Sequence, residues 1–185
     1  MIALHNQKFF ILLMVLYLVF FAFTKYLIIP FQLKFPVILP EYGAIIFIPS
    51  ACRILMIWLW GFKGFLGVVV ISILTMIIFE PKNSFDFNAV AVSIMSPLIT
   101  FIGFNLVGAL RINRLSPTYK TSMFRSMVLA VFVAALCNSL VMAYFWAQKG
   151  FLKVIYTVLI GDILGAIIGL FLIVPFVKKM LKTYM

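Results

Sequence analysis

Apolar residues fill six long stretches of the chain, and short segments between them carry most of the charges and prolines. A helix needs about 20 consecutive apolar residues to cross a bilayer, so each stretch is predicted to be one membrane-spanning helix. The connections are too short to house a separate soluble domain, and we expect one all-α, polytopic transmembrane helix bundle over residues 1–185. The expected spans are 9–29, 42–61, 64–79, 88–110, 126–147 and 154–177.

The composition places the chain in lipid. Of its 185 residues, 66% are hydrophobic and 10% are charged, and the mean hydropathy is +1.24. Soluble domains contain roughly 45–50% apolar residues, so this chain lies far outside their range. A soluble enzyme is excluded.

The formal net charge of +11 comes from lysines and arginines whose positions predict how the chain is oriented in the membrane. Lysine and arginine collect on the cytoplasmic flanks of membrane helices and face anionic headgroups, so the charge predicts a lipid partner and no nucleic acid. The cations that decide the orientation follow the fourth and sixth spans: Arg111, Arg114, Lys120, Arg125, Lys178, Lys179 and Lys182. Placing them inside predicts a multi-pass protein of a bacterial-type inner (plasma) membrane with both termini cytoplasmic. The connection from Glu80 to Asp86 is then external.

One acidic residue, Asp162, interrupts the last apolar stretch. A carboxylate near the bilayer centre costs roughly 2.5–3.5 kcal/mol on insertion scales, so it is expected to face the protein interior and to have a partner. Arg53, the one charge within the second stretch, is the predicted partner. Both helices enter from outside, which places Arg53 about 15–18 Å deep and Asp162 about 12 Å deep. The pair is predicted either to clamp the fold or to serve a ligand, with Arg53 receiving an anionic group.

Other polar side chains are expected to line the same interior. Ser50 lies one turn before Arg53 and follows Pro49, whose ring frees backbone carbonyls that can line a pocket. A lengthwise stripe in the fourth stretch and an amide in the fifth add Ser93, Ser96, Thr100 and Asn138. Hydrogen bonding between helices is the ordinary role of such groups, and contact with a ligand is the alternative.

Three glycines spaced by four residues, Gly161, Gly165 and Gly169, surround Asp162 in the sequence. This small-xxx-small pattern lets another backbone approach closely, so the three are predicted to be helix-packing positions.

No arrangement of catalytic residues is evident. The single histidine, His5, is near the N-terminus, and there is no nucleophile elbow or phosphate-binding glycine loop. Cys52 and Cys137 have no second sulfur or histidine at metal-ligand spacing. We therefore expect a non-enzymatic protein without a catalytic site, metal or cofactor. The proline-rich segment 30–40 is expected to lie in the external interface or to cap the external face.

Three motifs follow one another over roughly residues 43–177. They are Phe47-Ile48-Pro49-Ser50-Ala51-Cys52-Arg53 leading to Trp60-Gly61, an apolar run over 64–74, and Gly161-Asp162-Ile163-Leu164-Gly165 followed by an apolar run through Pro175. This order resembles the membrane-associated sensor (MASE) domain family of bacterial signalling proteins. The resemblance implies an integral signal-receiving module in which Asp162 and the Pro49 region are the matching positions. Because the chain ends soon after its last expected span, we expect a stand-alone version without an output domain that acts through a partner protein.

Two other functions remain open. The chain also resembles, by size and topology only, the substrate-binding membrane subunit of energy-coupling-factor vitamin transporters. Those subunits have an Ala-x-x-x-Ala element in the first helix, and residues 16–26 contain just Ala22. The third function is that of an accessory subunit within a larger membrane complex, with Gly165 and Gly169 as contact points. In every case the expected partners are the bilayer and either another membrane protein or a second copy of this chain.

Overall fold

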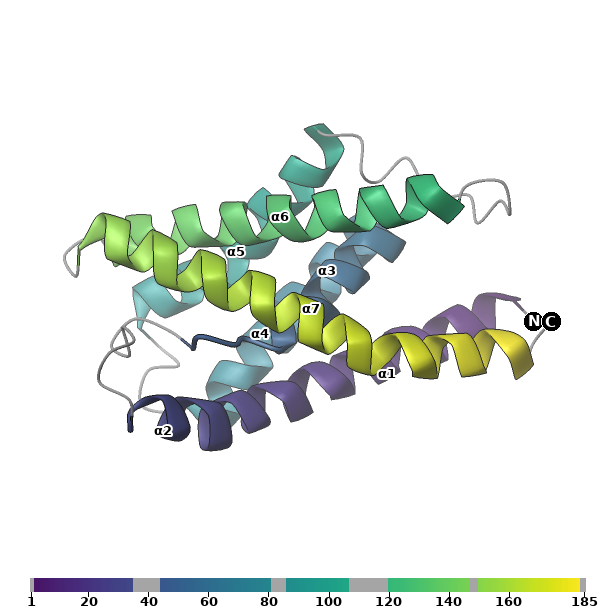
Figure 1. Ribbon diagram of the computed structural model, residues 1–185, viewed down its shortest axis with the longest axis horizontal. Helices are drawn as coiled ribbons and strands as arrows, with labels where there is room; N and C mark the ends of the chain where they lie inside the picture. The colour runs from purple at the N-terminus through teal and green to yellow at the C-terminus, as the bar shows by residue number, and fades with distance from the viewer. Residues whose placement is uncertain (1, 35–43, 81–85, 107–119, 147–149, 184–185) are drawn as a thin grey trace.

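A computed structural model of the protein describes residues 2–34, 44–80, 86–106, 120–146 and 150–183 (Figure 1). Within these ranges the fold is all-helical and contains no strand. The helical elements are α1 (Ile2–Phe23), η1 (Thr24–Ile28), α2 (Ile29–Gln32), α3 (Pro49–Trp60), α4 (Phe62–Phe79), α5 (Phe87–Leu106), α6 (Lys120–Phe145) and α7 (Phe151–Thr183).

Five helices in the described part of the chain are long and apolar enough to cross a membrane. They cover Gln7–Gln32, Phe62–Phe79, Phe87–Leu106, Met127–Phe145 and Phe151–Ile173. The prediction of an all-α, multi-span protein is confirmed to this extent, but the expected number of six such helices is not reached.

The difference lies in the second expected span, 42–61. Residues 44–48 are not helical, and α3 has 12 residues. At 1.5 Å per residue α3 is about 18 Å long, well short of a hydrocarbon core of about 30 Å. Pro49 begins the helix, where its fixed φ is suitable and no N–H is needed, and Gly61 ends it with a φ of 55°.

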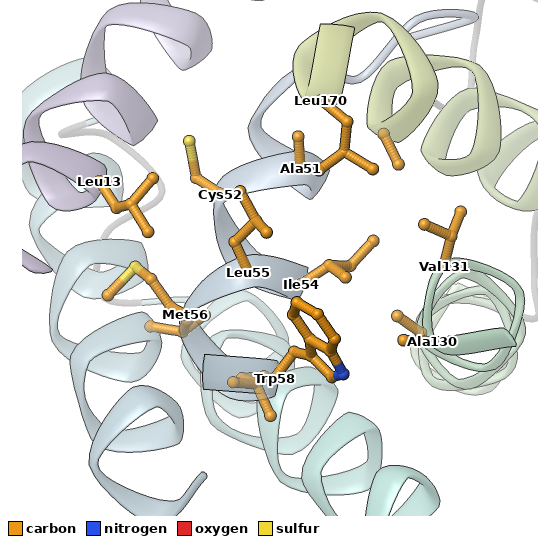
Figure 2. Close-up of a cluster of buried hydrophobic side chains, with 14 of the residues drawn as sticks. Leu13, Ala51, Cys52, Ile54, Leu55, Met56, Trp58, Ala130, Val131 and Leu170 are labelled. Atoms are coloured by element: carbon orange, nitrogen blue, oxygen red, sulfur yellow. The ribbon is translucent and has the colours of Figure 1, made fainter. Parts of the chain in front are cut away.

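The short helix α3 lies at the centre of the bundle. Every residue from Pro49 to Trp58 is buried, and the helix packs against α1, α4, α5, α6 and α7. Figure 2 shows its side chains among Leu13 of α1, Val131 of α6 and Leu170 of α7. A mainly apolar helix that carries a charge such as Arg53 is stable where protein surrounds it and supplies a partner for the charge, which is the position that α3 occupies.

The first span contains a π-helical turn. The elements α1, η1 and α2 form one continuous helix, in which the N–H of Ile29 donates to the carbonyl of Thr24, five residues earlier. Pro30 follows this turn directly, and its ring clashes with the carbonyl four residues before it in a regular helix. A wider turn at this place is consistent with that clash.

The start of α1 and the end of α7 lie at the same end of the bundle (Figure 1). The orientation of this end relative to the cytoplasm stays a prediction. Of the expected external segment 30–40, residues 30–32 continue the first helix, and residues 35–40 lie outside the described residues. The predicted orientation residues Arg111 and Arg114 lie outside the described residues, and the side chains of Lys120 and Arg125 and of the lysines after residue 177 are not described either.

Candidate functional site

The non-helical segment 44–48 and the start of α3 pack directly against the three glycines of α7. A Cβ added at Gly161, Gly165 or Gly169 would meet, in that order, the carbonyl of Ala44, the backbone of Phe47 and the side chain of Ala51. The N–H of Phe47 also donates to the carbonyl of Gly161 over 2.9 Å. Non-helical backbone inside a membrane protein requires protein cover and hydrogen-bond partners. This face of α7 covers residues 44–48 and supplies an acceptor for the N–H of Phe47.

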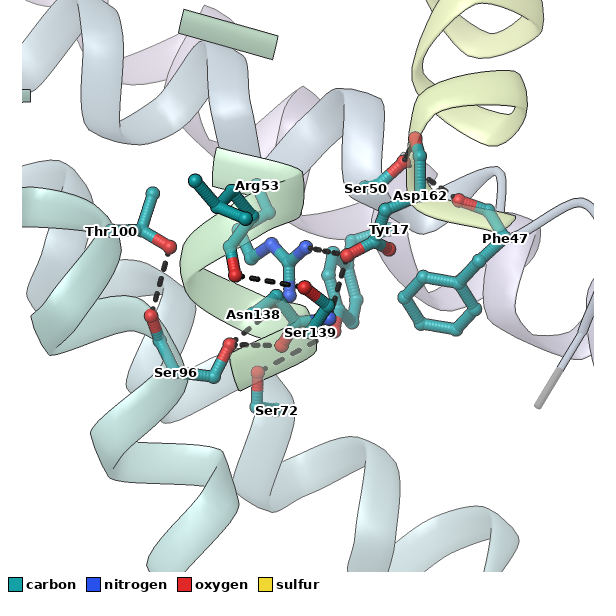
Figure 3. Close-up of polar contacts among 11 residues, drawn as sticks. Tyr17, Phe47, Ser50, Arg53, Ser72, Ser96, Thr100, Asn138, Ser139 and Asp162 are labelled. Atoms are coloured by element: carbon teal, nitrogen blue, oxygen red, sulfur yellow. Dashed lines mark hydrogen bonds and ion pairs between the residues drawn. The ribbon is translucent and has the colours of Figure 1, made fainter. Parts of the chain in front are cut away.

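Arg53 of α3 and Asp162 of α7 form a buried ion pair (Figure 3). The distance between Arg53 Nη2 and Asp162 Oδ2 is 2.8 Å, and the two side chains are 6% and 1% exposed. Arg53 Nη1 also donates to Ser96 Oγ of α5 over 3.2 Å, and Asn138 Nδ2 of α6 donates to Asp162 Oδ2 over 2.6 Å. Ser96 Oγ donates in turn to Asn138 Oδ1. Four helices therefore contribute one side chain each to a single hydrogen-bonded network.

Ser50 fixes the position of this network from the start of α3. Its Oγ lies 2.9 Å from the backbone carbonyl oxygen of Asp162 and 2.8 Å from that of Phe47. The single hydroxyl proton donates to one of these two acceptors. Ser50 therefore links the start of α3 to the backbone of α7 at Asp162, close to the ion pair.

A cavity of about 350 Å³ lies beside the network. It extends from Arg53 and Asp162 to Lys25 and Glu80, whose side chains are 28% and 39% exposed. Its apolar walls include Tyr17, Phe21, Phe47, Val92, Pro97, Met142, Trp146 and Val158. Uncharged polar side chains also line it, and they include Thr24, Ser72, Thr75, Ser93, Ser96 and Asn138. Pockets for small molecules typically have about 300–1,000 Å³, so this cavity is at the lower end of that range.

A second ion pair stands at the partly exposed end of the cavity, which we call the mouth. Lys25 Nζ lies 3.3 Å from Glu80 Oε1 and donates to the carbonyl of Phe79 over 2.5 Å. This contact joins the π turn of the first span to the end of α4. The cavity is therefore lined by two charged pairs, and its other walls contain both apolar and polar side chains.

The predicted site residues fall into two groups. Arg53, Asp162, Asn138 and Ser96 meet directly, and Ser50 contacts the backbone of Asp162. Two others lie apart from the network, since Ser93 Oγ bonds Met76 Sδ and the carbonyl of Ala89, and Thr100 Oγ1 bonds the carbonyl of Ser96. Ser93 still lines the cavity, whereas Thr100 does not.

Several cavity residues were not singled out from the sequence, among them Tyr17, Thr24, Ser72 and Thr75. Tyr17 Oη and Ser72 Oγ lie 3.4 Å apart, and the Thr75 hydroxyl donates to its own helix. Isolated hydroxyls of this kind occur along most membrane helices, so the sequence contains no signal that marks these ones.

Among the described residues, no three His, Cys, Asp or Glu side chains lie close enough to hold a metal ion. Comparisons with known protein families, with curated proteins and with solved structures found no match to the chain. The resemblance to membrane-associated sensor domains therefore stays a prediction, and the function is inferred from the site itself.

Proposed function

We propose that this chain is a non-enzymatic, sensor-like membrane module that receives a small solute in the cavity and communicates its presence to a partner protein. The observation that most supports this is the polar network of α3, α5, α6 and α7 at the inner end of a solute-sized cavity. A solute that binds one arrangement of these helices more tightly than another shifts the equilibrium toward that arrangement. A partner in contact with the helices then detects the shift.

The expected orientation agrees with this role. With both termini in the cytoplasm of a cell with an inner (plasma) membrane, the mouth formed by Lys25 and Glu80 faces the exterior. The cavity then receives a solute from outside, and the cytoplasmic ends of the helices are the proposed contact with an output protein. An ion pair that only clamped the fold would require no such cavity.

The substrate-binding subunit of a small-solute transporter is the second candidate, supported by the same external mouth and cavity. The two candidates differ in the partner, which is a kinase or cyclase for a sensor and an ATPase assembly for a transporter. The accessory-subunit hypothesis relied on Gly165 and Gly169 as contacts with another protein. Both glycines instead contact residues 47–51 of this chain, which leaves that hypothesis without the feature that motivated it.

Filling the cavity tests the proposal. We expect Val92→Trp to reduce the solute that co-purifies with the tagged protein from native membranes by about tenfold or more, since Val92 lines the cavity. The matched control is Ile94→Trp, because Ile94 lies two residues away on the other side of α5 and is 38% exposed. Mass spectrometry of extracted small molecules and of co-purifying proteins gives the readout for both variants and the wild type.

Equal solute content in the wild type and in Val92→Trp would show that the cavity is not the binding site. Wild-type protein that purifies with neither a solute nor a partner would contradict the proposed function altogether. A kinase or cyclase among the co-purifying proteins supports the sensor, and an ATPase supports the transporter subunit.

A further inference from the structure

We infer that the cavity takes uncharged, partly apolar solutes that offer a hydrogen-bond-accepting oxygen, such as a carbonyl, to Arg53 Nε and Thr24 Oγ1. This inference rests on the proposed function and adds the chemical class of the solute.

Two buried polar atoms, both in residues that line the cavity, have no hydrogen-bond partner among the described residues. They are Arg53 Nε and Thr24 Oγ1. An unpaired buried donor destabilises a protein by about 1–3 kcal/mol, which makes such atoms rare in proteins. The guanidinium Nε can only donate a hydrogen bond, and the threonine hydroxyl can donate as well. A solute that satisfies both must therefore offer an acceptor.

Thr24 differs from the other threonines whose side chains the structure describes. Thr75, Thr100 and Thr157 each donate to the carbonyl four residues earlier in their own helix. Thr24 makes no such bond and begins the π turn η1. π turns occur frequently at functional sites, and the free hydroxyl gives this one a function in binding.

The charges around the cavity favour a neutral solute. Arg53 is already paired with Asp162 over 2.8 Å, and Lys25 is paired with Glu80 over 3.3 Å, so the four charges of the lining cancel. An anionic solute at Arg53 would place a second carboxylate beside Asp162, and like charges at short range are unfavourable in a low dielectric. A cationic solute would approach the guanidinium itself. The anionic group expected at Arg53 from the sequence is therefore replaced by an uncharged acceptor.

The apolar lining of the cavity determines what kind of solute body fits between the two charged pairs. Four aromatic rings belong to this lining, those of Tyr17, Phe21, Phe47 and Trp146. Aromatic and aliphatic walls select a solute with an apolar body, and the polar side chains of the lining then orient that solute.

Three probes of similar size separate the charge classes: indole-3-acetamide, indole-3-acetate and tryptamine. We expect the full chain in lipid nanodiscs to bind the amide saturably in equilibrium dialysis, at least about tenfold more tightly than the anion or the cation. Thr24→Val is expected to weaken amide binding about 5- to 30-fold. Since this change removes an unpaired buried hydroxyl, the Tm of the empty protein should stay constant or rise. Thr157→Val is the matched control, because Thr157 is buried but bonded to its own helix and outside the cavity.

Binding of the acetate or of tryptamine as tight as that of the amide would overturn the neutral class while leaving the solute site itself intact. Unchanged amide affinity in Thr24→Val would overturn the assignment of the acceptor. If none of the three probes binds to a protein that co-purifies with a solute from native membranes, this inference alone fails. If the native preparation is empty as well, the proposed function fails with it.

Discussion

Replacing Asp162 by leucine is expected to lower the free energy of unfolding by about 3–5 kcal/mol. The change leaves the guanidinium of Arg53 buried without its carboxylate partner and removes the acceptor of Asn138 Nδ2. A charge deep in the protein cannot regain water, so the cost of its burial is no longer offset. Reversible unfolding in mixed detergent micelles measures the loss.

The double substitution Arg53→Met with Asp162→Leu is expected to recover most of this stability, because both buried charges leave together and the volumes stay similar. Glu80→Leu, which breaks the partly exposed pair with Lys25, should cost less than about 1 kcal/mol. The double variant also separates the two roles of the pair, since it restores the fold but lacks Arg53 Nε and should not bind indole-3-acetamide. A double variant as unstable as Asp162→Leu would contradict this account of the pair.

The meeting of Arg53 and Asp162 could be predicted from the sequence because each is the only charge in its apolar stretch. Charges in a medium of low dielectric constant must find each other or a polar cavity, and few arrangements satisfy this. The same reasoning brought Asn138 and Ser96 into the candidate interior, where the structure places both against the ion pair. Polar groups in lipid have few alternative partners, and this makes their contacts predictable.

The nature of α3 could not be predicted in the same way. A helix buried in protein and a helix surrounded by lipid have the same hydropathy, so residues 42–61 read as one more span. The signal was the proline at position 49, which begins the helix in the middle of that stretch. The unpaired hydroxyl of Thr24 could not be predicted from the sequence either, because it depends on the π turn, and Pro30 alone does not specify such a turn.

Gly165→Ala is expected to lower the free energy of unfolding by about 1–3 kcal/mol, although alanine is the better helix former by about 1 kcal/mol. The new Cβ would overlap the backbone of Phe47, which is held in place by its own hydrogen bond to Gly161. The carbonyl of Phe47 also accepts a hydrogen bond from the N–H of Ser50, so this backbone cannot move aside as easily as a side chain can. Any shift that does occur displaces Phe47 from the cavity wall, so solute binding should weaken together with stability.

Gly103→Ala is the matched control for this effect, since it makes the same chemical change within a helix. There the added Cβ meets only the ends of two side chains, Val133 Cγ1 at 2.9 Å and Cys137 Sγ at 3.0 Å. Both can move slightly, so we expect a smaller loss of stability or none, and unchanged solute binding. Thermal unfolding of the two variants in the same lipid compares them directly. If Gly165→Ala were as stable as Gly103→Ala, the close approach of residues 44–48 to α7 would not be what positions Arg53 opposite Asp162.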